Sequence, residues 1–219
     1  MHCELRSTYK FSERKYLESF FNMGNVRIGT LFDFRSSEHK QGIADPTEGT
    51  KIIRRNFHFP DGPSEEDIAA MVSMRIADPE SAKHITMINS PARRRGFSED
   101  CFIYCTSAYS SKSIMSEFGS ADSCYELYNG NAFYDRITSA LNEIVPVRFV
   151  AIEAVHYRTR TEEWSASGDG RHPSFIQEEE FSGQFEVRAI WAPREKIEIA
   201  PVVINDIGLT KFCREVKPR

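Results

Sequence analysis

Long apolar runs and closely spaced cysteine pairs are both missing from this sequence. No stretch approaches the roughly 18–20 apolar residues that a bilayer-spanning helix needs, so we expect no membrane segment. Residues 1–6 hold no apolar core of a secretory signal, which favours a cytoplasmic location. The five cysteines are odd in number and include no C-x-x-C pair, which favours free thiols in a reducing compartment.

Common metal and nucleotide motifs are missing too. Cys101 and Cys105 lie near each other and His84 lies upstream, but no further ligands follow at zinc spacing, so we expect no metal. No glycine-rich phosphate loop is present, which argues against a nucleotide kinase. The net charge of −4 argues against a protein that simply coats nucleic acid, although it allows a local basic patch.

What the sequence does contain is typical of a globular chain. Its 219 residues are 40% hydrophobic and include 16 Phe and 8 Tyr, enough to bury a core without disulfides or metals. No linker rich in Pro, Gly or Ser divides it, so we predict a single domain over residues 1–219.

Apolar spacing and turn residues predict a mixture of helices and strands. A helix is expected between Ser12, as N-cap, and Gly24, as stop; a second is expected to begin at Ser64. Shorter helical patterns cover 113–118 and 133–141, whereas 77–100 is expected to be irregular and 159–172 to be a mobile loop. Strands are expected at 5–11, 26–32, 52–59, 101–106, 124–128, 147–155, 184–191 and 196–203. This order lacks regular βαβ alternation and predicts the α+β class.

One late segment places an amide and a carboxylate together. Gln184 and Glu186 are separated by one residue on an expected strand, so both side chains should point to the same face. A carboxylate there can hydrogen-bond a ribose hydroxyl and stabilise positive charge on a sugar carbon, while the amide orients an acceptor. An exposed strand face explains the same pair without any function.

Two other expected strands carry polar groups at informative places. The strand over 101–106 runs into Thr106 and Ser107, whose hydroxyls suit a ribose or a carboxylate. The first strand carries Arg6 and Lys10 on one face, where a cation can hold a pyrophosphate. Ordinary structural explanations are a polar turn in the first case and a charge-protected edge strand in the second.

Read together, these segments resemble the ADP-ribosyltransferase fold in its Arg-Ser-Glu branch. Residues 181–186 look like that family's aromatic-bearing turn and Gln/Glu-x-Glu pair, and 104–107 look like its aromatic-Ser-Thr-Ser strand end. Cys105 stands where the first serine is usual, and a thiol can steady the catalytic glutamate only weakly. Either Arg6 or Lys10 matches the basic residue of the first strand.

The chain also resembles an uncharacterised bacterial domain family associated with phage defence. That family has a tyrosine-lysine-aromatic start, an Asp-Pro-x-Glu loop, a strand that ends in serine and a late Glu-x-Glu-x-Arg-like strand. The corresponding segments here are 9–11, 45–48, 105–107 and 184–188, in an order that spans nearly the whole chain.

The resemblance implies split β-sheets with an NAD cleft between them and helices on the flanks. NAD would be the substrate of a mono-ADP-ribosyl transfer that passes through an oxocarbenium-like transition state. Glu186 would stabilise that charge and Gln184 would orient the acceptor, while Phe34 or Tyr104 would stack on nicotinamide. The residues implied to contact NAD are Arg6, Tyr9, Lys10, Phe34, Thr106 and Ser107.

The acceptor is implied less directly. In related enzymes, a Gln-x-Glu pair goes with an asparagine amide or a nucleobase as acceptor. The run Arg93, Arg94 and Arg95 could bind nucleic-acid phosphates, and a solvated surface run explains it as well. The loop 45–49 is either a structural turn or a lid in which Asp45 or Glu48 contacts a ribose. The implied partners are a nucleic acid or protein acceptor and a neutralising protein, in a toxin or antiviral defence role.

Two other functions stay open from the sequence. Cys105 favours a non-catalytic module that binds NAD or nucleic acid on the same fold, whereas the intact Gln184 and Glu186 pair disfavours it. An NAD glycohydrolase, with water as the acceptor, would use the same residues.

Overall fold

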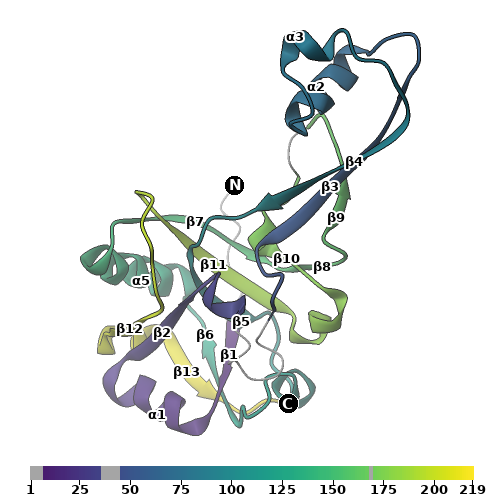
Figure 1. The fold of residues 1–219 in the computed structure, drawn as a ribbon. Helices are drawn as coiled ribbons and strands as arrows, with labels where there is room; N and C mark the ends of the chain where they lie inside the picture. Colours follow the sequence, from purple (N-terminus) through teal and green to yellow (C-terminus); the bar gives the residue numbers. More distant parts are fainter. Residues whose placement is uncertain (1–6, 36–44, 168–169) are drawn as a thin grey trace.

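The computed structural model describes residues 7–35, 45–167 and 170–219. A body built around a large β-sheet carries an elongated extension made by the β3–β4 hairpin with α2 and α3 at its end (Figure 1). The strands are β1 Thr8–Ser12, β2 Asn25–Thr30, β3 Thr50–Phe59, β4 Met87–Phe97, β5 Phe102–Ser107, β6 Ser123–Leu127, β7 Val147–Ala154, β8 His156–Tyr157, β9 Thr161–Glu163, β10 Ile176–Gln177, β11 Glu186–Pro193, β12 Val202–Asn205 and β13 Cys213–Val216. The α-helices are α1 Arg14–Met23, α2 Glu65–Ser73, α3 Pro79–Ala82, α4 Lys112–Ser116 and α5 Gly130–Ile144. The 3₁₀ helices are η1 Asp33–Arg35, η2 Pro173–Phe175, η3 Glu179–Gln184 and η4 Ile207–Phe212. The predicted α+β class is confirmed.

The eight-stranded sheet of the body splits at its central strand, β5. One edge of β5 pairs along its whole length with β11, and β7 lies beyond. The other edge is shared, because β1 pairs at Ser107 whereas β2 pairs at Phe102 and Ile103. β1 leads on to β6 and β13, and β2 leads on to β12. No described strand pairs with residues 104–106 on this edge, so the sheet opens there.

The main core fills the space between the sheet and the helices α1 and α5. Helix α5 contributes Phe133, Ile137 and Leu141 at the expected helical spacing, and all three are fully buried with Trp191 of β11. The Phe20 ring of α1 stacks on Tyr125 of β6, with 4.7 Å between centroids. Burial of these apolar faces stabilises the body and fixes the position of the split.

Helix α1 ends as predicted but begins differently. Gly24 adopts a left-handed conformation with φ of 73°, and its amide donates to the Phe20 carbonyl. A Cβ at this position would lie 2.1 Å from the backbone of Asp206, so only glycine fits. The expected N-cap at Ser12 is wrong, because Ser12 is the last residue of β1 and Glu13 is the N-cap.

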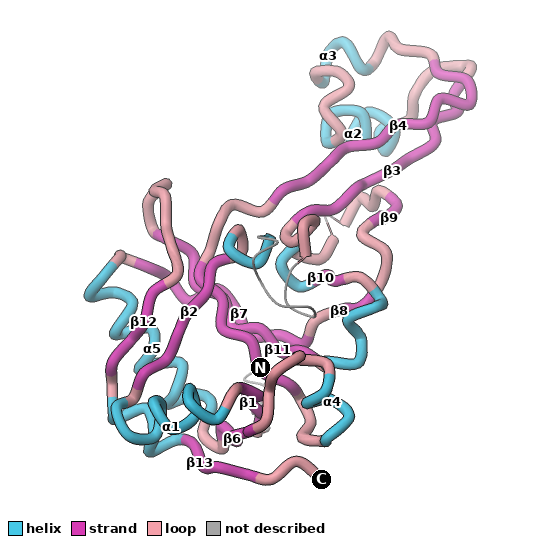
Figure 2. Tube along the Cα trace, turned by 60° about the horizontal axis from the view of Figure 1, so that its bottom comes forward, coloured by secondary structure: helices cyan, strands magenta, loops and turns pink. Residues whose placement is uncertain are grey.

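The extension has a small core of its own. The buried side chains of Phe57, Phe59, Met71 and Met74 pack together. The helices α2 and α3 lie at the end of the extension, away from the sheet of the body (Figure 2). Ser64 begins α2 as predicted, in a reciprocal capping box with Asp67. The single-domain prediction stays a prediction.

Several predicted boundaries need correction. Residues 77–100 are not irregular, since they contain α3 and the long strand β4. The region 159–172 contains β9, which pairs in parallel with β3, and the expected strand 196–203 shrinks to β12. β4 and β9 are polar along most of their length, so hydrogen bonding to a neighbouring strand, not an apolar pattern, defines them.

Among the helices of the described ranges, none combines the length and apolar character required to cross a bilayer.

Candidate functional site

A cleft of about 720 Å³ occupies the place where the sheet splits. Its lining comes from β1, β2, β5 and β11, together with the start of α1, Phe34 and Glu48. The volume lies within the range of small-molecule sites, which average a few hundred to about 1,000 Å³. The cleft therefore offers room for a nucleotide-sized ligand against the unpaired edge of β5.

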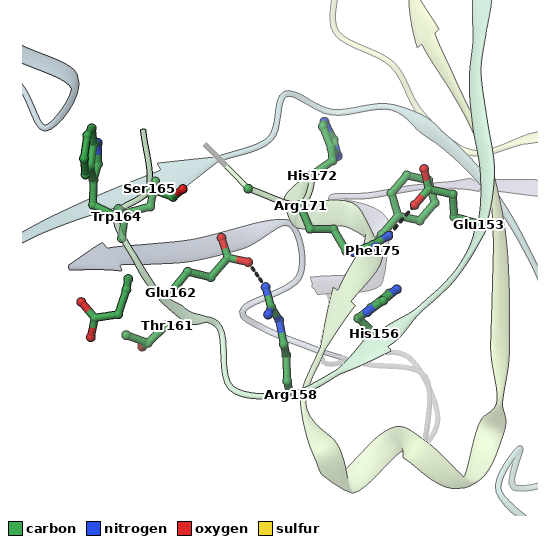
Figure 3. A pocket seen from close by; sticks show the side chains of 13 residues that line it. Glu153, His156, Arg158, Thr161, Glu162, Trp164, Ser165, Arg171, His172 and Phe175 are labelled. Carbon is green, nitrogen blue, oxygen red and sulfur yellow. Dashed lines mark hydrogen bonds and ion pairs between the residues drawn. The ribbon is translucent and has the colours of Figure 1, made fainter. Parts of the chain in front are cut away.

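A larger cavity, of about 940 Å³, lies beside the extension and is a weaker candidate (Figure 3). Its charges are paired with one another: Arg158 with Glu162, and Arg171 with Glu153. Burial and nearby cations lower the pKa of His172, whose Nδ1 already accepts from the Ser174 amide. Because these charged side chains already pair with one another, the cleft is the stronger candidate for chemistry.

Three buried charged groups form the floor of the cleft. Arg188 lies between two carboxylates and donates to both oxygens of each, at 2.8 and 3.0 Å to Glu48 and at 3.0 and 3.1 Å to Glu186. Burial would lower the pKa of Arg188, but the adjacent Glu186 and Glu48 raise it well above its ordinary value. Burial also raises the pKa of Glu48, although Arg188 opposes this. The cluster holds two carboxylates and a single guanidinium, an excess of negative charge (Glu48 1%, Arg188 2% and Glu186 5% exposed).

Lys10 brings a positive charge to the opposite wall. Its Nζ donates to the carbonyl of Cys105 at 2.8 Å and lies 4.9 Å from the centre of the Tyr104 ring. The lysine thus satisfies a carbonyl that the split leaves without a strand partner. Burial lowers the pKa of Lys10, while Cys105 and Glu186 oppose the shift. A cation beside a buried carboxylate in a cleft is typical of a functional site.

Gln184 and Glu186 both line the cleft, but not for the predicted reason. Gln184 closes the 3₁₀ segment η3, and Phe185 adopts a left-handed conformation with φ of 46°, so the pair does not share an extended strand. The Ser107 hydroxyl donates to the Gln184 carbonyl at 2.8 Å and the Ala108 amide donates to the Phe185 carbonyl at 2.8 Å. A bulky residue rarely adopts this backbone, and such strain gathers at functional sites.

The other predicted NAD contacts are divided between the cleft and elsewhere. Tyr9, Lys10, Phe34, Thr106 and Ser107 all line the cleft. The hydroxyls of Thr106 and Ser107 are already donated to the carbonyls of Val187 and Gln184, so they hold strands together.

Tyr104 also lines the cleft, although its side chain is 2% exposed and its hydroxyl lies 2.6 Å from that of Tyr125 in the core. The remaining predicted residues are not placed in the cleft. Arg6 lies outside the described residues. Arg93, Arg94 and Arg95 do not line the cleft, because they lie on β4 in the extension.

Sequence reasoning assigned no site role to Arg188, Tyr157 or Gln177. Arg188 lies two residues after Glu186 on β11. Side chains at i and i+2 of a strand point to the same face, so the sequence could have indicated that the two lie together. Tyr157 accepts a hydrogen bond from the Glu186 amide at 2.6 Å, and Gln177 is its neighbour in the β8–β10 pair. Nothing in the local sequence indicates that Gln177 reaches the cleft or that Tyr157 contacts Glu186.

Cys105 lies near the Glu186 carboxylate, which a serine would position in the family that the sequence resembles. It lies opposite Arg188 in the β5–β11 ladder, close enough to the Glu186 carboxylate for that charge to act on its thiol. Burial, followed by the charge of Glu186, raises the pKa of this thiol well above its ordinary value.

Cys105 is therefore expected to react slowly with iodoacetamide, since the thiolate is the reactive form. Glu186→Gln removes a negative charge that raises this pKa, so alkylation at about pH 8 should accelerate, on the order of tenfold. Peptide mass spectrometry over time measures the rate at Cys105. Glu126→Gln, in an ion pair outside the cleft, is the control and should leave the rate unchanged. Equal rates in the wild type and Glu186→Gln would contradict the contact.

Comparison of the chain with protein-family models, with curated proteins and with solved structures found no match. The function is therefore argued from the geometry of the cleft.

Proposed function

We propose that this protein binds NAD in the cleft of the split sheet and transfers the ADP-ribosyl group to a macromolecular acceptor. The observation that carries the proposal is the buried Glu186 carboxylate, which lines the cleft between Gln184 and Arg188 and faces the charge of Lys10. A carboxylate fixed in a water-poor site stabilises positive charge far better than one in water.

The arrangement of charge suits NAD in particular. Two carboxylates share one guanidinium, and the excess negative charge favours the cationic nicotinamide ring and the cationic sugar that follows it. Lys10 offers a cation for the pyrophosphate. The cleft therefore offers a carboxylate for the developing sugar cation and, facing it, an ammonium group for the adjacent phosphates.

In the proposed reaction, the bond between nicotinamide nitrogen and the ribose carbon breaks, and its electron pair leaves with nicotinamide. Glu186 stabilises the sugar cation, and Gln184 orients the nucleophile that attacks it. The acceptor forms the new bond to the ribose carbon and releases a proton to solvent. Arg188 holds the Glu186 carboxylate in place with two hydrogen bonds.

The extension supports a nucleic-acid acceptor. Arg93 and Arg95 are exposed on one face of β4, and Phe97 follows them on that face with 65% of its surface exposed. Exposed cations beside an aromatic ring suit phosphates and unpaired bases.

The first experiment incubates the protein with NAD labelled in its adenylate part, alone and with a cell extract. Nicotinamide release together with label on a nuclease-sensitive or protease-sensitive product supports transfer. Release of free ADP-ribose identifies a glycohydrolase instead, and NAD binding without turnover identifies a non-catalytic module. Absence of both binding and release overturns the proposal.

The double variant Arg93→Glu, Arg95→Glu tests the acceptor surface. We expect labelling of nucleic acid to fall by about tenfold or more, since each lost phosphate contact weakens binding. Nicotinamide release into water should not change, because neither residue lines the cleft. Lys196→Glu, Lys217→Glu, also exposed, matches the charge change on the body and should leave labelling intact. Unchanged labelling in the extension variant would remove support for this surface.

A further inference from the structure

The side chain of Gln177 is buried in the cleft without the hydrogen bonds that such burial requires. The residue is 3% exposed and lines the cleft. Its Oε1 has no hydrogen-bond partner among the described residues. Buried polar atoms are almost always paired, because an unpaired one loses its hydration without compensation. A polar side chain that is left unpaired in a cleft indicates a ligand that pairs with it.

The position of Gln177 identifies which part of the cleft it serves. Gln177 pairs in register with Tyr157, and the Tyr157 hydroxyl accepts a hydrogen bond from the Glu186 amide. Arg188 donates to the carbonyl of Ser174, which lies on the short segment that leads into Gln177. The unpaired amide therefore belongs to the carboxylate end of the cleft.

We infer that Gln177 recognises the carboxamide of the nicotinamide ring and makes the site selective for NAD over dinucleotides that lack this amide. This inference rests on the proposed function. The group that leaves from the carbon beside Glu186 is nicotinamide, and its NH₂ donates to the Gln177 Oε1. A ring that carries a carboxylate instead brings no donor, and its negative charge faces both Oε1 and the carboxylate cluster. The adenine amine is also a donor, but adenine lies at the other end of the dinucleotide.

The test measures dissociation constants for three probes by calorimetry: NAD, its nicotinic acid counterpart and its hypoxanthine counterpart. The wild type should bind NAD at least tenfold more tightly than the nicotinic acid form, the loss expected for one unpaired buried group. Exchange of adenine for hypoxanthine should have little effect. Gln177→Met, which keeps the length but removes the amide, should reduce the preference for NAD several-fold, while the repulsion between the nicotinic acid carboxylate and the carboxylate cluster remains.

Two controls separate recognition from folding. Asn25→Ala alters a cleft amide that already donates to Ser19 at 2.8 Å, and it should leave the preference for NAD unchanged. Gln177→Met should unfold at the same temperature as the wild type or higher, because it removes an unpaired polar group from a buried site.

The outcomes distinguish the inference from the function on which it rests. If the wild type binds NAD but Gln177→Met keeps the full preference over the nicotinic acid form, the inference is overturned and the proposed function stands. Loss of discrimination against hypoxanthine alone would assign Gln177 to adenine and also overturn it. If the wild type binds none of the three probes, both fail.

Discussion

Glu186→Gln is expected to lower the rate of nicotinamide release from NAD by about 10²–10³-fold while the protein stays folded. The substitution keeps the size of the side chain and leaves Arg188 its two hydrogen bonds to Glu48. It removes the negative charge that stabilises the sugar cation. Because the sugar cation develops in the transition state, kcat should fall by much more than the KM for NAD rises through the weaker attraction to the nicotinamide ring.

A matched control distinguishes loss of charge in the cleft from loss of an ion pair. Glu126 of β6 is also buried and pairs with an arginine, Arg214, at 2.6 Å, but it does not line the cleft. Glu126→Gln should therefore retain wild-type turnover. Thermal unfolding of both variants confirms that each is folded before rates are compared. A Glu186→Gln enzyme with wild-type kcat would refute the assignment of Glu186.

The sequence predicted most strands and helices of the body because their apolar patterns are strong. The strand β5 and the buried stripe of α5 follow directly from the spacing of side chains such as Phe133 and Ile137. β4 was missed, since polar residues alternate along it and its pairing with β3 decides its conformation. β13, whose residues 214 and 215 are charged, was missed for the same reason.

The site was predictable in its residues but not in its geometry. The resemblance drew attention to Glu186, Gln184 and Lys10, and all three line the cleft. The left-handed backbone at Phe185 has no signature in the sequence, because contacts with Ser107 and Ala108 impose it on a residue that disfavours it. Likewise, only the tertiary fold joins Glu48, 140 positions away, to Arg188.

The largest effect on stability is expected at the center of the buried cluster. Arg188→Met should lower the free energy of unfolding by about 3–5 kcal/mol, because it leaves Glu48 and Glu186 buried without their shared cation. Urea unfolding, followed by the fluorescence of the buried Trp191, measures the loss. Arg214→Met is the control, since the Arg214 side chain is 66% exposed and its ion pair should contribute at most about 1 kcal/mol.

The pH dependence of the stability of Arg188→Met distinguishes an unpaired buried carboxylate from a simple packing defect. Burial already raises the pKa of Glu48 in the folded protein, and removal of Arg188 takes away the charge that opposes this rise. A carboxyl whose folded-state pKa is raised favours folding when it is protonated, and that stability is lost as the pH rises through the folded-state pKa. The difference in free energy of unfolding between Arg188→Met and the wild type should therefore shrink as the pH falls from about 7 to about 5.

Glu48→Gln combined with Arg188→Met should recover part of the stability at pH 7, because one buried charge is then gone. A deficit that is equal at both pH values, and unrelieved in the double variant, would mean that packing alone accounts for the role of Arg188.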